Sequence, residues 1–481
     1  MWKRRTLSPP NSKRFVYTPE EEKLLRKINI MTVPYICVIC FLQYLDKTIL
    51  NTSSVMGLFE DTKITGNQFG WLGSIYYLGY LSLQFPNQYL LQKIPISKYL
   101  GTALIVWGTI LGCTAFATNF AQMAALRFLL GFAEAASYPA LYLLVSIIYR
   151  RSEQVTWFGV IQMSSAFAGA FGGLISFGFL RNMNGVYGLS AWKWNMIILG
   201  AITVGVGICT FLFLPDTAKS RWYRLTLQET QIVDERIRDN TVVQNKKIKS
   251  EQLLEAIKEP RFYCMSLIPF FDNMVNGVTS IFSTLIIKSM GFSNLESTLL
   301  NIPLGITSAI LDFTAIYLSH RYNENCYVGC LMAFIVVIGL LLLVVLPTGG
   351  VMLMGIFILS IGSVDIFPAL LVANNVNGYS KKVLYNSANL VSYCLGNFVG
   401  PLLMREEQAP RYLGGMITYL VVMLLVTFLF LYVRWTYVQD NQYRLHLKAE
   451  ESQQVPLPSM KEDCKPVDCT DKQDLLFLYR P

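Results

Sequence analysis

Four charged residues interrupt stretches of the chain that are otherwise long and apolar. Asp46 and Lys47 are adjacent, and Arg127 precedes Glu134 by seven residues. Seven residues make two helical turns, so Arg127 and Glu134 lie on one face of a predicted helix. A charge at membrane depth costs at least about 2.5 kcal/mol on insertion scales, so these four residues are candidates for a functional site.

Two interpretations of the four charges are open. In the functional one, Asp46 and Glu134 exchange protons while Lys47 or Arg127 holds an anionic substrate. Burial favours the neutral form of a carboxyl group and a nearby cation favours the ionised form, so small rearrangements can load or release a proton. In the structural one, two acids and two bases neutralise each other as a buried network that fixes the packing of the helices.

Other polar residues within apolar stretches are weaker candidates. Asp272, Asp312 and Asp365 have no obvious basic neighbour in sequence, and we expect packed structural acids. Asp272 has the better functional prospect because Asn273 and Asn276 make its segment polar. Gln162 stands in an apolar segment and is predicted to face a cavity. The candidate substrate-binding residues are Lys47, Arg127, Gln162, Asn276, Asn389 and Asn397.

The elements that position these residues are twelve apolar segments, split six and six by a charged stretch over 216–261. Each is about 20 residues long, enough to cross a hydrocarbon core of roughly 30 Å as a helix. Barrel strands are about half as long and alternate in polarity, so helices are predicted. The segments lie at 28–50, 69–91, 100–118, 123–149, 157–180, 195–214, 263–287, 298–318, 328–346, 351–372, 383–403 and 413–433.

The composition excludes several classes of function. Hydrophobic residues make up 53% of the chain and charged residues 15%, against about 25% charged in soluble domains. The ten cysteines and two histidines do not form a metal-ligand pattern, so no metal and no cofactor are predicted. No Gly-rich phosphate-binding motif supports drive by ATP. The net charge of +9 follows from membrane topology and does not indicate nucleic-acid binding.

Charge also predicts the topology. The first 27 residues carry eight Lys or Arg and no apolar core of a cleavable signal. An even number of spans places both termini on one side, and the positive-inside rule makes that side the cytosol. The predicted units are a cytosolic tail (1–27), a six-helix half (28–214), a cytosolic loop (215–262), a second six-helix half (263–438) and a tail without periodic core (439–481), expected to be mostly disordered.

Two six-helix halves joined by a cytosolic loop are the plan of secondary transporters, with substrate bound between the halves near the midplane. Alternatives remain within and beyond that class. They are an uncoupled facilitator or exchanger, and a nutrient sensor built on a transporter fold. An intramembrane enzyme is disfavoured because no predicted span contains a histidine or a paired nucleophile and base.

Several motifs, in order along the chain, resemble the major facilitator superfamily and, within it, the fungal allantoate permease family of anion:cation symporters. Leu45-Asp46-Lys47 is similar to the family's Leu-Asp-Arg, and Arg127 to Pro139 is similar to its signature in the fourth helix. Further matches are Gly79-Tyr80, Pro86-Asn87, Trp192-Lys-Trp194, Leu214-Pro-Asp216, Asn374 to Lys382 and Ala409 to Gly415. The matches span most of the predicted membrane part.

The resemblance implies an all-α membrane protein that imports small organic anions with protons, such as allantoate, vitamin acids, amino-acid-like compounds or sulfonates. It implies that Lys47 grips the substrate carboxylate, that Asp46 and Glu134 are protonatable, and that Arg127 pairs with Glu134 when no proton is bound. Two departures stand out: Lys47 replaces an arginine and loses its bidentate fork, and Gln84 stands where a glutamate is common. We therefore expect a monomeric proton symporter in a fungal membrane, most simply the plasma membrane, in contact with lipid.

Overall fold

The computed structural model describes residues 18–240, 249–359, 364, 366–454, 469–474 and 477–481, and within these residues every regular element is a helix. Nine described helical stretches are long and apolar enough to cross a membrane. The N-terminal half contains α1 (Pro19–Ser53), α2 (Leu58–Thr62), α3 (Gly66–Lys93), α4 (Ile96–Thr114), α5 (Phe120–Glu134), α6 (Ser137–Ile148), α7 (Arg151–Asn182), η1 (Val186–Gly188) and α8 (Ala191–Phe213).

A connector of η2 (Arg221–Tyr223), α9 (Leu227–Asn240) and α10 (Ser250–Ile257) leads into the C-terminal half. That half contains α11 (Pro260–Ser289), α12 (Asn294–Leu299), α13 (Asn301–Tyr322), α14 (Asn325–Val345), η3 (Gly350–Met352), α15 (Leu353–Leu359), α16 (Ile366–Asn375), α17 (Tyr379–Val399), η5 (Gly400–Leu403), η6 (Glu406–Gln408) and α18 (Leu413–Gln454). The fold is all-α, as predicted.

Apart from the tenth, each predicted apolar segment falls mainly on a helix or on two consecutive helices. The tenth segment covers η3, α15 and α16 and includes residues outside the described ranges, Asp365 among them. The helices α3 and α17 are 28 and 21 residues long but are not among the nine apolar spans, because polar residues interrupt them. Both lie on the interface between the two halves, which we call the seam and which α1, α3 and α7 form with α11, α17 and α13. That the chain crosses the membrane twelve times stays a prediction.

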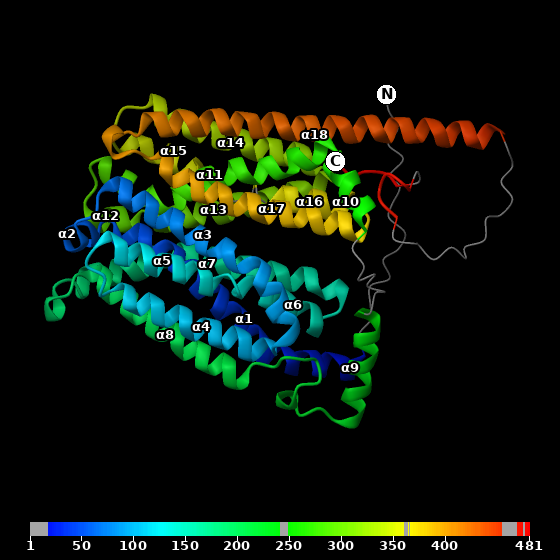
Figure 1. Cartoon of the computed structure of the whole chain (residues 1–481), viewed down its shortest axis with the longest axis horizontal. Coiled ribbons are helices and arrows are strands. Elements are labelled where there is room, and N and C mark those ends of the chain that lie inside the picture. Colours follow the sequence, from blue (N-terminus) through cyan, green and yellow to red (C-terminus); the bar gives the residue numbers. More distant parts are fainter. Residues whose placement is uncertain (1–17, 241–248, 360–363, 365, 455–468, 475–476) are drawn as a thin grey trace.

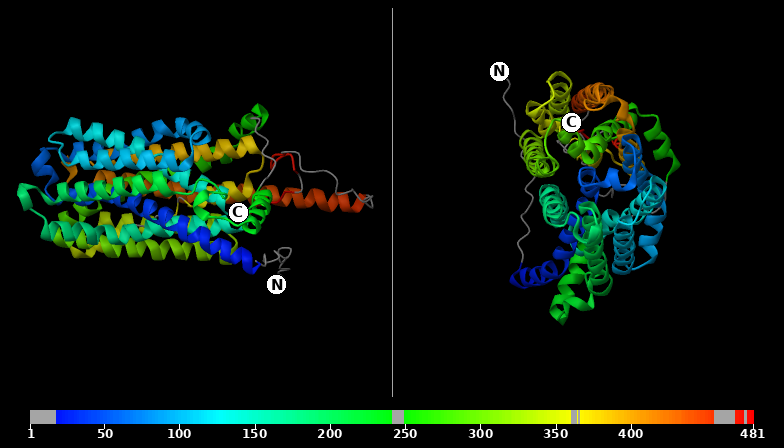
Figure 2. Two further views of the ribbon diagram at one scale, coloured as in Figure 1. Left: turned by 90° about the horizontal axis from the view of Figure 1, so that it is seen from below. Right: turned by 90° about the vertical axis from the view of Figure 1, so that its left-hand side faces the viewer.

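The two halves form two layers of helices (Figure 1), and the end-on view in Figure 2 shows them as two groups. Within the N-terminal half α4 packs on α8, α3 on α5 and α1 on α7, while in the C-terminal half α11 packs on α17 and α14 on α18. Across the seam α7 packs on α13, α3 on α17 and α1 on α11. We call the end that carries the start of α1, the connector and the C-terminus the connector end, and the opposite end the far end.

A proline explains the break between α5 and α6. Pro139 has no N–H to donate and its ring crowds the carbonyl four residues earlier, so the helix is interrupted near Ala135. The freed carbonyl of Ala135 accepts a hydrogen bond of 3.2 Å from the Asn87 side chain of α3. Glu134 is thereby the last residue of α5, at a bend in the interior of its half.

Helices extend into both predicted tails among the described residues. The helix α1 begins at Pro19, within the predicted N-terminal tail, because the Thr18 side chain caps its first turn. The prediction of a mostly disordered C-terminal tail is wrong for the described residues, since α18 continues to Gln454. The last residues pack on the C-terminal half, where Tyr479 is buried and the carbonyl of Pro481 accepts from the Asn325 N–H at 2.8 Å. Composition predicted disorder because the helices that bury these last residues are distant in sequence and leave no local pattern.

Candidate functional site

Asp46 and Arg127 form a buried layer inside the N-terminal half. Both are buried, and the indole N–H of Trp107 in α4 donates a hydrogen bond to one carboxylate oxygen of Asp46. Asp46 is the strongest charged neighbour of Arg127. No ion pair within 4 Å joins Arg127 to Asp46 or Glu134 among the described residues. Arg127 and Asp46 therefore interact through their charges and without direct contact. Asp46 is thus held by α4 and faces α5.

Glu134 is the most isolated acid of the site. It has 0% exposure, and neither carboxylate oxygen makes a hydrogen bond of good geometry within the described part of the chain. Tyr76 of α3 and Gln43 of α1 are its nearest polar neighbours, and Asp46 and Lys47 act on it through their charges. Buried carboxylates are normally hydrogen-bonded, so this arrangement suits a group that changes its protonation state.

Lys47 follows Asp46 in the chain but points elsewhere, because successive residues of a helix lie about 100° apart. Its Nζ donates to the hydroxyl of Tyr393 in α17 at 3.4 Å, across the seam between the halves. The ring of Tyr138 in α6 lies 5.9 Å from the same nitrogen. No carboxylate among the described residues lies within 4 Å of this nitrogen. An ammonium group without an acidic partner, between two halves, can hold an anion.

The C-terminal half contributes a cluster of amides. Asn397 of α17 donates to Asn273 of α11 at 2.7 Å, and Asn276 donates to Asn397 at 3.3 Å. The predicted residues Asn276 and Asn397 therefore come together, with Asn273 as a third member that was not among the predicted binding residues. Its signal was the run of polar residues after Asp272.

The remaining predicted residues lie apart from this cluster. Asn389 is half-buried on α17, and its side-chain oxygen has no hydrogen-bond partner in the described residues. Gln162 is exposed on α7, and its predicted role in a cavity stays a prediction. Asp272 is buried in α11 and Asp312 is half-buried in α13. The charges of the site are thus concentrated on α1 and α5.

The far end of the seam is closed by hydrogen bonds between the halves. The Asn51 side chain in α1 donates to the Ser283 hydroxyl at 2.6 Å and accepts from the Thr284 N–H at 2.9 Å. The Glu406 carboxylate in η6 accepts from the N–H of Gly66 at 2.8 Å, where it caps the N-terminus of α3. Sequence reasoning missed Asn51 and Glu406, because their partners lie more than 200 residues away.

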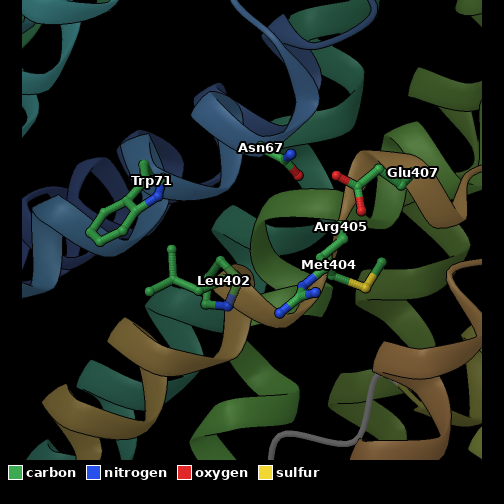
Figure 3. A pocket seen from close by; sticks show the side chains of 7 residues that line it. Asn67, Trp71, Leu402, Met404, Arg405 and Glu407 are labelled. Carbon is green, nitrogen blue, oxygen red and sulfur yellow. The ribbon is translucent and has the colours of Figure 1, made fainter.

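A small cavity of about 310 Å³ lies in this closed region. Figure 3 shows its lining, with Asn67 and Trp71 of α3 on one side and residues of η5, η6 and the turn between them on the other. The lining residues are Asn67, Trp71, Pro401, Leu402, Met404, Arg405 and Glu407. It lies between the elements that Glu406 joins, and so belongs to the far-end closure.

The seam between α3 and α17 changes character along its length. Ring pairs cross it at Trp71 with Phe398, 6.1 Å apart, and at Tyr77 with Tyr393, 6.0 Å apart. Further toward the connector end, the two helices enclose a cavity of about 350 Å³. The hydrogen bonds that join Lys47, Asn51, Gly66 and Asn67 to the C-terminal half lie at the level of Lys47 or beyond it toward the far end. These contacts hold the two halves together on the far-end side of the buried charges.

Known proteins are similar to this chain in sequence. Residues 36–401 match the sequence pattern of the Major Facilitator Superfamily. The allantoate permease of Saccharomyces cerevisiae is 30% identical over 97% of this chain and 89% of its own length. A thiamine pathway transporter of the same yeast is 30% identical over 95% of this chain and 86% of its own.

Solved structures agree on the fold. A bacterial homologue of the human lysosomal transporter Spinster has a TM-score of 0.66 at 15% identity, covering 88% of this chain and 99% of its own. A D-xylose–proton symporter has a TM-score of 0.63 at 12% identity, covering 83% of this chain and 97% of its own. The chain is thus a multi-pass membrane transporter and not an enzyme, and it belongs to the Major Facilitator Superfamily and, within it, to the fungal allantoate permease family.

Proposed function

We propose that this protein imports a small organic anion together with protons by alternating access. The observation that carries the proposal is the placement of Lys47, whose ammonium has no carboxylate within 4 Å among the described residues and contacts Tyr393 of the opposite half. An anion bound there touches both halves, so its binding can bias their relative position. Relatives named for allantoate and cysteine support an organic substrate that carries a carboxylate.

Proton coupling follows from the balance of the four charges. Asp46 and Arg127 are each other's strongest charged neighbours, which leaves Glu134 and Lys47 to balance one another. When an anion occupies Lys47, that cation no longer compensates the buried Glu134 carboxylate. Glu134 then takes up a proton, because an uncompensated charge at this depth is costly. Binding of anion and proton is therefore mutually favourable, which is the requirement for symport.

The direction of transport rests on the membrane topology. The connector end carries Lys23, Arg26 and Lys27 at the start of α1, and we assign this end to the cytosol by the positive-inside rule. The structure is then the state in which the substrate site faces the cytosol and the far end is closed to the outside. A plasma membrane location fits uptake from the medium, and the proposed functional unit is the monomer.

Purified protein in proteoliposomes with an internal pH dye tests this function. A panel of small carboxylates and sulfonates is added outside, with protein-free liposomes as the control for passive entry of weak acids. We expect protein-dependent acidification for a subset of the panel. Protein-dependent exchange of labelled anions without any proton movement would instead identify an uncoupled facilitator or exchanger and contradict the proposal.

A further inference from the structure

The cavity between α3 and α17 lies on the connector side of the Tyr77–Tyr393 ring pair, and the mechanism above does not use it. Its volume is about 350 Å³, enough for part of a small organic molecule. Both polar and apolar side chains line it, and none of the lining side chains is charged. They include Leu81, Gln84, Gln88, Asn386, Ser387 and Leu390.

Gln84 is the unusual member of this lining. Its side chain is only 5% exposed, yet neither its amide nitrogen nor its amide oxygen has a hydrogen-bond partner among the described residues. Buried side-chain amides are nearly always paired, because an unpaired one loses its bonds to water without replacement. Asn386 and Ser387 line the same cavity from α17 and do not pair with it. Both polar atoms are closed off from solvent in this arrangement, so the amide reaches a molecule in the cavity when its side chain turns toward it.

The chemistry of an amide defines what fits. Gln84 offers two donors and one acceptor, so it matches a group that both donates and accepts, such as a carboxamide or a hydroxyl. The lining holds no cation for the charged end of an anion. Apolar side chains on both helices suit a short hydrocarbon chain.

The position of Gln84 relates this cavity to the proposed anion site. Tyr77 and Gln84 are seven residues apart, so they share one face of α3 and lie about 10 Å apart along its axis. Tyr77 faces Tyr393, which accepts the hydrogen bond from Lys47. With the reach of the lysine and glutamine side chains included, a small extended molecule can contact both.

We propose that Gln84 binds the uncharged hydrogen-bonding end of the transported anion, so that the substrate is an organic acid that also carries a carboxamide or hydroxyl group. This inference rests on the proposed function, since it takes Lys47 as the site of the acidic end. A pocket that hydrogen-bonds a substrate group discriminates strongly against analogues that lack it, because the buried polar group is left unpaired again. Simple hydrocarbon acids are therefore poor ligands.

Equilibrium binding to the purified full-length protein in detergent tests the inference without interference from passive membrane passage. The probes are succinamate, glutaramate and adipamate, each compared with the acid in which an isopropyl group replaces the carboxamide. We expect at least one carboxamide acid to bind about tenfold or more tightly than its hydrocarbon counterpart. In Gln84→Leu this preference falls to less than about threefold, while the hydrocarbon acid binds as before.

The matched control is Gln92→Leu, the same substitution on an exposed position of α3, which should keep the preference. The absence of any preference in the wild type, including the absence of binding, or an unchanged preference in Gln84→Leu, would overturn the inference. Lys47→Ala separates the two proposals, because it should weaken all probes alike and leave the preference intact. If Lys47→Ala changes no affinity while Gln84→Leu still removes the preference, the anion site is wrong and the Gln84 site stands.

Discussion

The ammonium of Lys47 in α1 lies 3.4 Å from the hydroxyl of Tyr393 in α17, and this contact joins the two halves at the level of the buried charges. A hydroxyl is a weak partner for an ammonium group, because it carries no compensating charge. An anion that displaces it would gain a charge-assisted hydrogen bond while remaining in contact with both halves. The contact thus marks where binding and conformational change meet.

Removal of the Lys47 ammonium should abolish most anion binding. We expect Lys47→Ala to raise the half-saturation concentration for uptake by about 10- to 100-fold, since a hydrogen bond to a charged group contributes about 1.5–3 kcal/mol. Lys47→Arg should retain transport. The measurement is initial uptake by cells expressing equal amounts of surface protein, with the exposed residue variant Lys63→Ala as the control. Normal uptake by Lys47→Ala would show that the anion binds elsewhere.

Asn51 should hold the far end closed. Asn51→Leu loses the hydrogen bonds to Ser283 and Thr284, and two such bonds contribute about 1–3 kcal/mol to the closed arrangement. Hydrogen–deuterium exchange should therefore become faster in peptides covering 278–290 and 400–412. Thr109→Ala is the control, because Thr109 is exposed on α4 and bonds only within its helix. Identical exchange in Asn51→Leu and wild type would argue against this lock.

Lys381 should be essential for the stability of the connector end. It has 0% exposure and forms ion pairs with Glu255 at 2.9 Å, Glu259 at 2.7 Å and Asp471 at 2.8 Å. Lys381→Met removes the cation shared by these acids and leaves Lys472 paired with Glu259 alone, and breaking a buried pair typically costs about 3–5 kcal/mol. We expect a clear fall in the thermal unfolding temperature of the purified protein.

Lys382→Met provides the matched control for Lys381, because the Lys382 ammonium is outside the ion-pair network and donates to the carbonyl of Ala373. Its unfolding temperature should stay close to that of the wild type. If both lysine variants unfold at the same temperature, the buried network does not stabilise this end. The network also ties the C-terminal residues to the connector, since Asp471 and Glu255 contact the same cation.

Asp61 in α2 should make the far end sensitive to acid. Burial opposes its ionisation, but hydrogen bonds from Ser190 and Trp192 and the ammonium of Lys193 lower the pKa of Asp61 below its usual value. A lowered pKa stabilises the folded state above the ordinary carboxyl range, and this contribution is lost as the pH falls below about 4. Unfolding temperatures between about pH 6 and pH 3 should therefore fall more steeply in the wild type than in Asp61→Asn. Parallel curves would contradict this role.

The sequence predicted the helices better than it predicted the site. A long apolar run satisfies its backbone hydrogen bonds in a membrane as a helix, and among the described residues the predicted segments lie mainly on helices. The four charged residues were identified because a charge inside a membrane segment is costly. Which partner each one faces, Arg127 for Asp46 and Tyr393 for Lys47, depends on which helix packs beside each face of α1. That information lies in contacts such as Trp107 with Asp46, which join residues 61 positions apart.

A residue whose own chemistry constrains the backbone has an effect that can be understood from the sequence. Pro139 interrupts the helix near Glu134, as its missing N–H requires. By contrast, nothing near Gln84 in sequence shows that its amide is unpaired in a cavity, because α17 supplies the opposite wall. The packed C-terminal residues were missed for the same reason, since distant helices bury Tyr479.

Glu134 carries the central claim, because its buried carboxylate makes no hydrogen bond of good geometry in the described residues and is the proposed proton carrier. The direct test compares wild type, Glu134→Gln and Asp46→Asn in proteoliposomes under an inward proton gradient, with the anion that gives the largest acidification. The wild type should accumulate the labelled anion and acidify the interior. Glu134→Gln should still exchange internal for external anion, yet neither accumulate it nor acidify. Proton-driven accumulation retained in Glu134→Gln would contradict the role of Glu134, and accumulation retained in both Glu134→Gln and Asp46→Asn would contradict proton coupling through these acids.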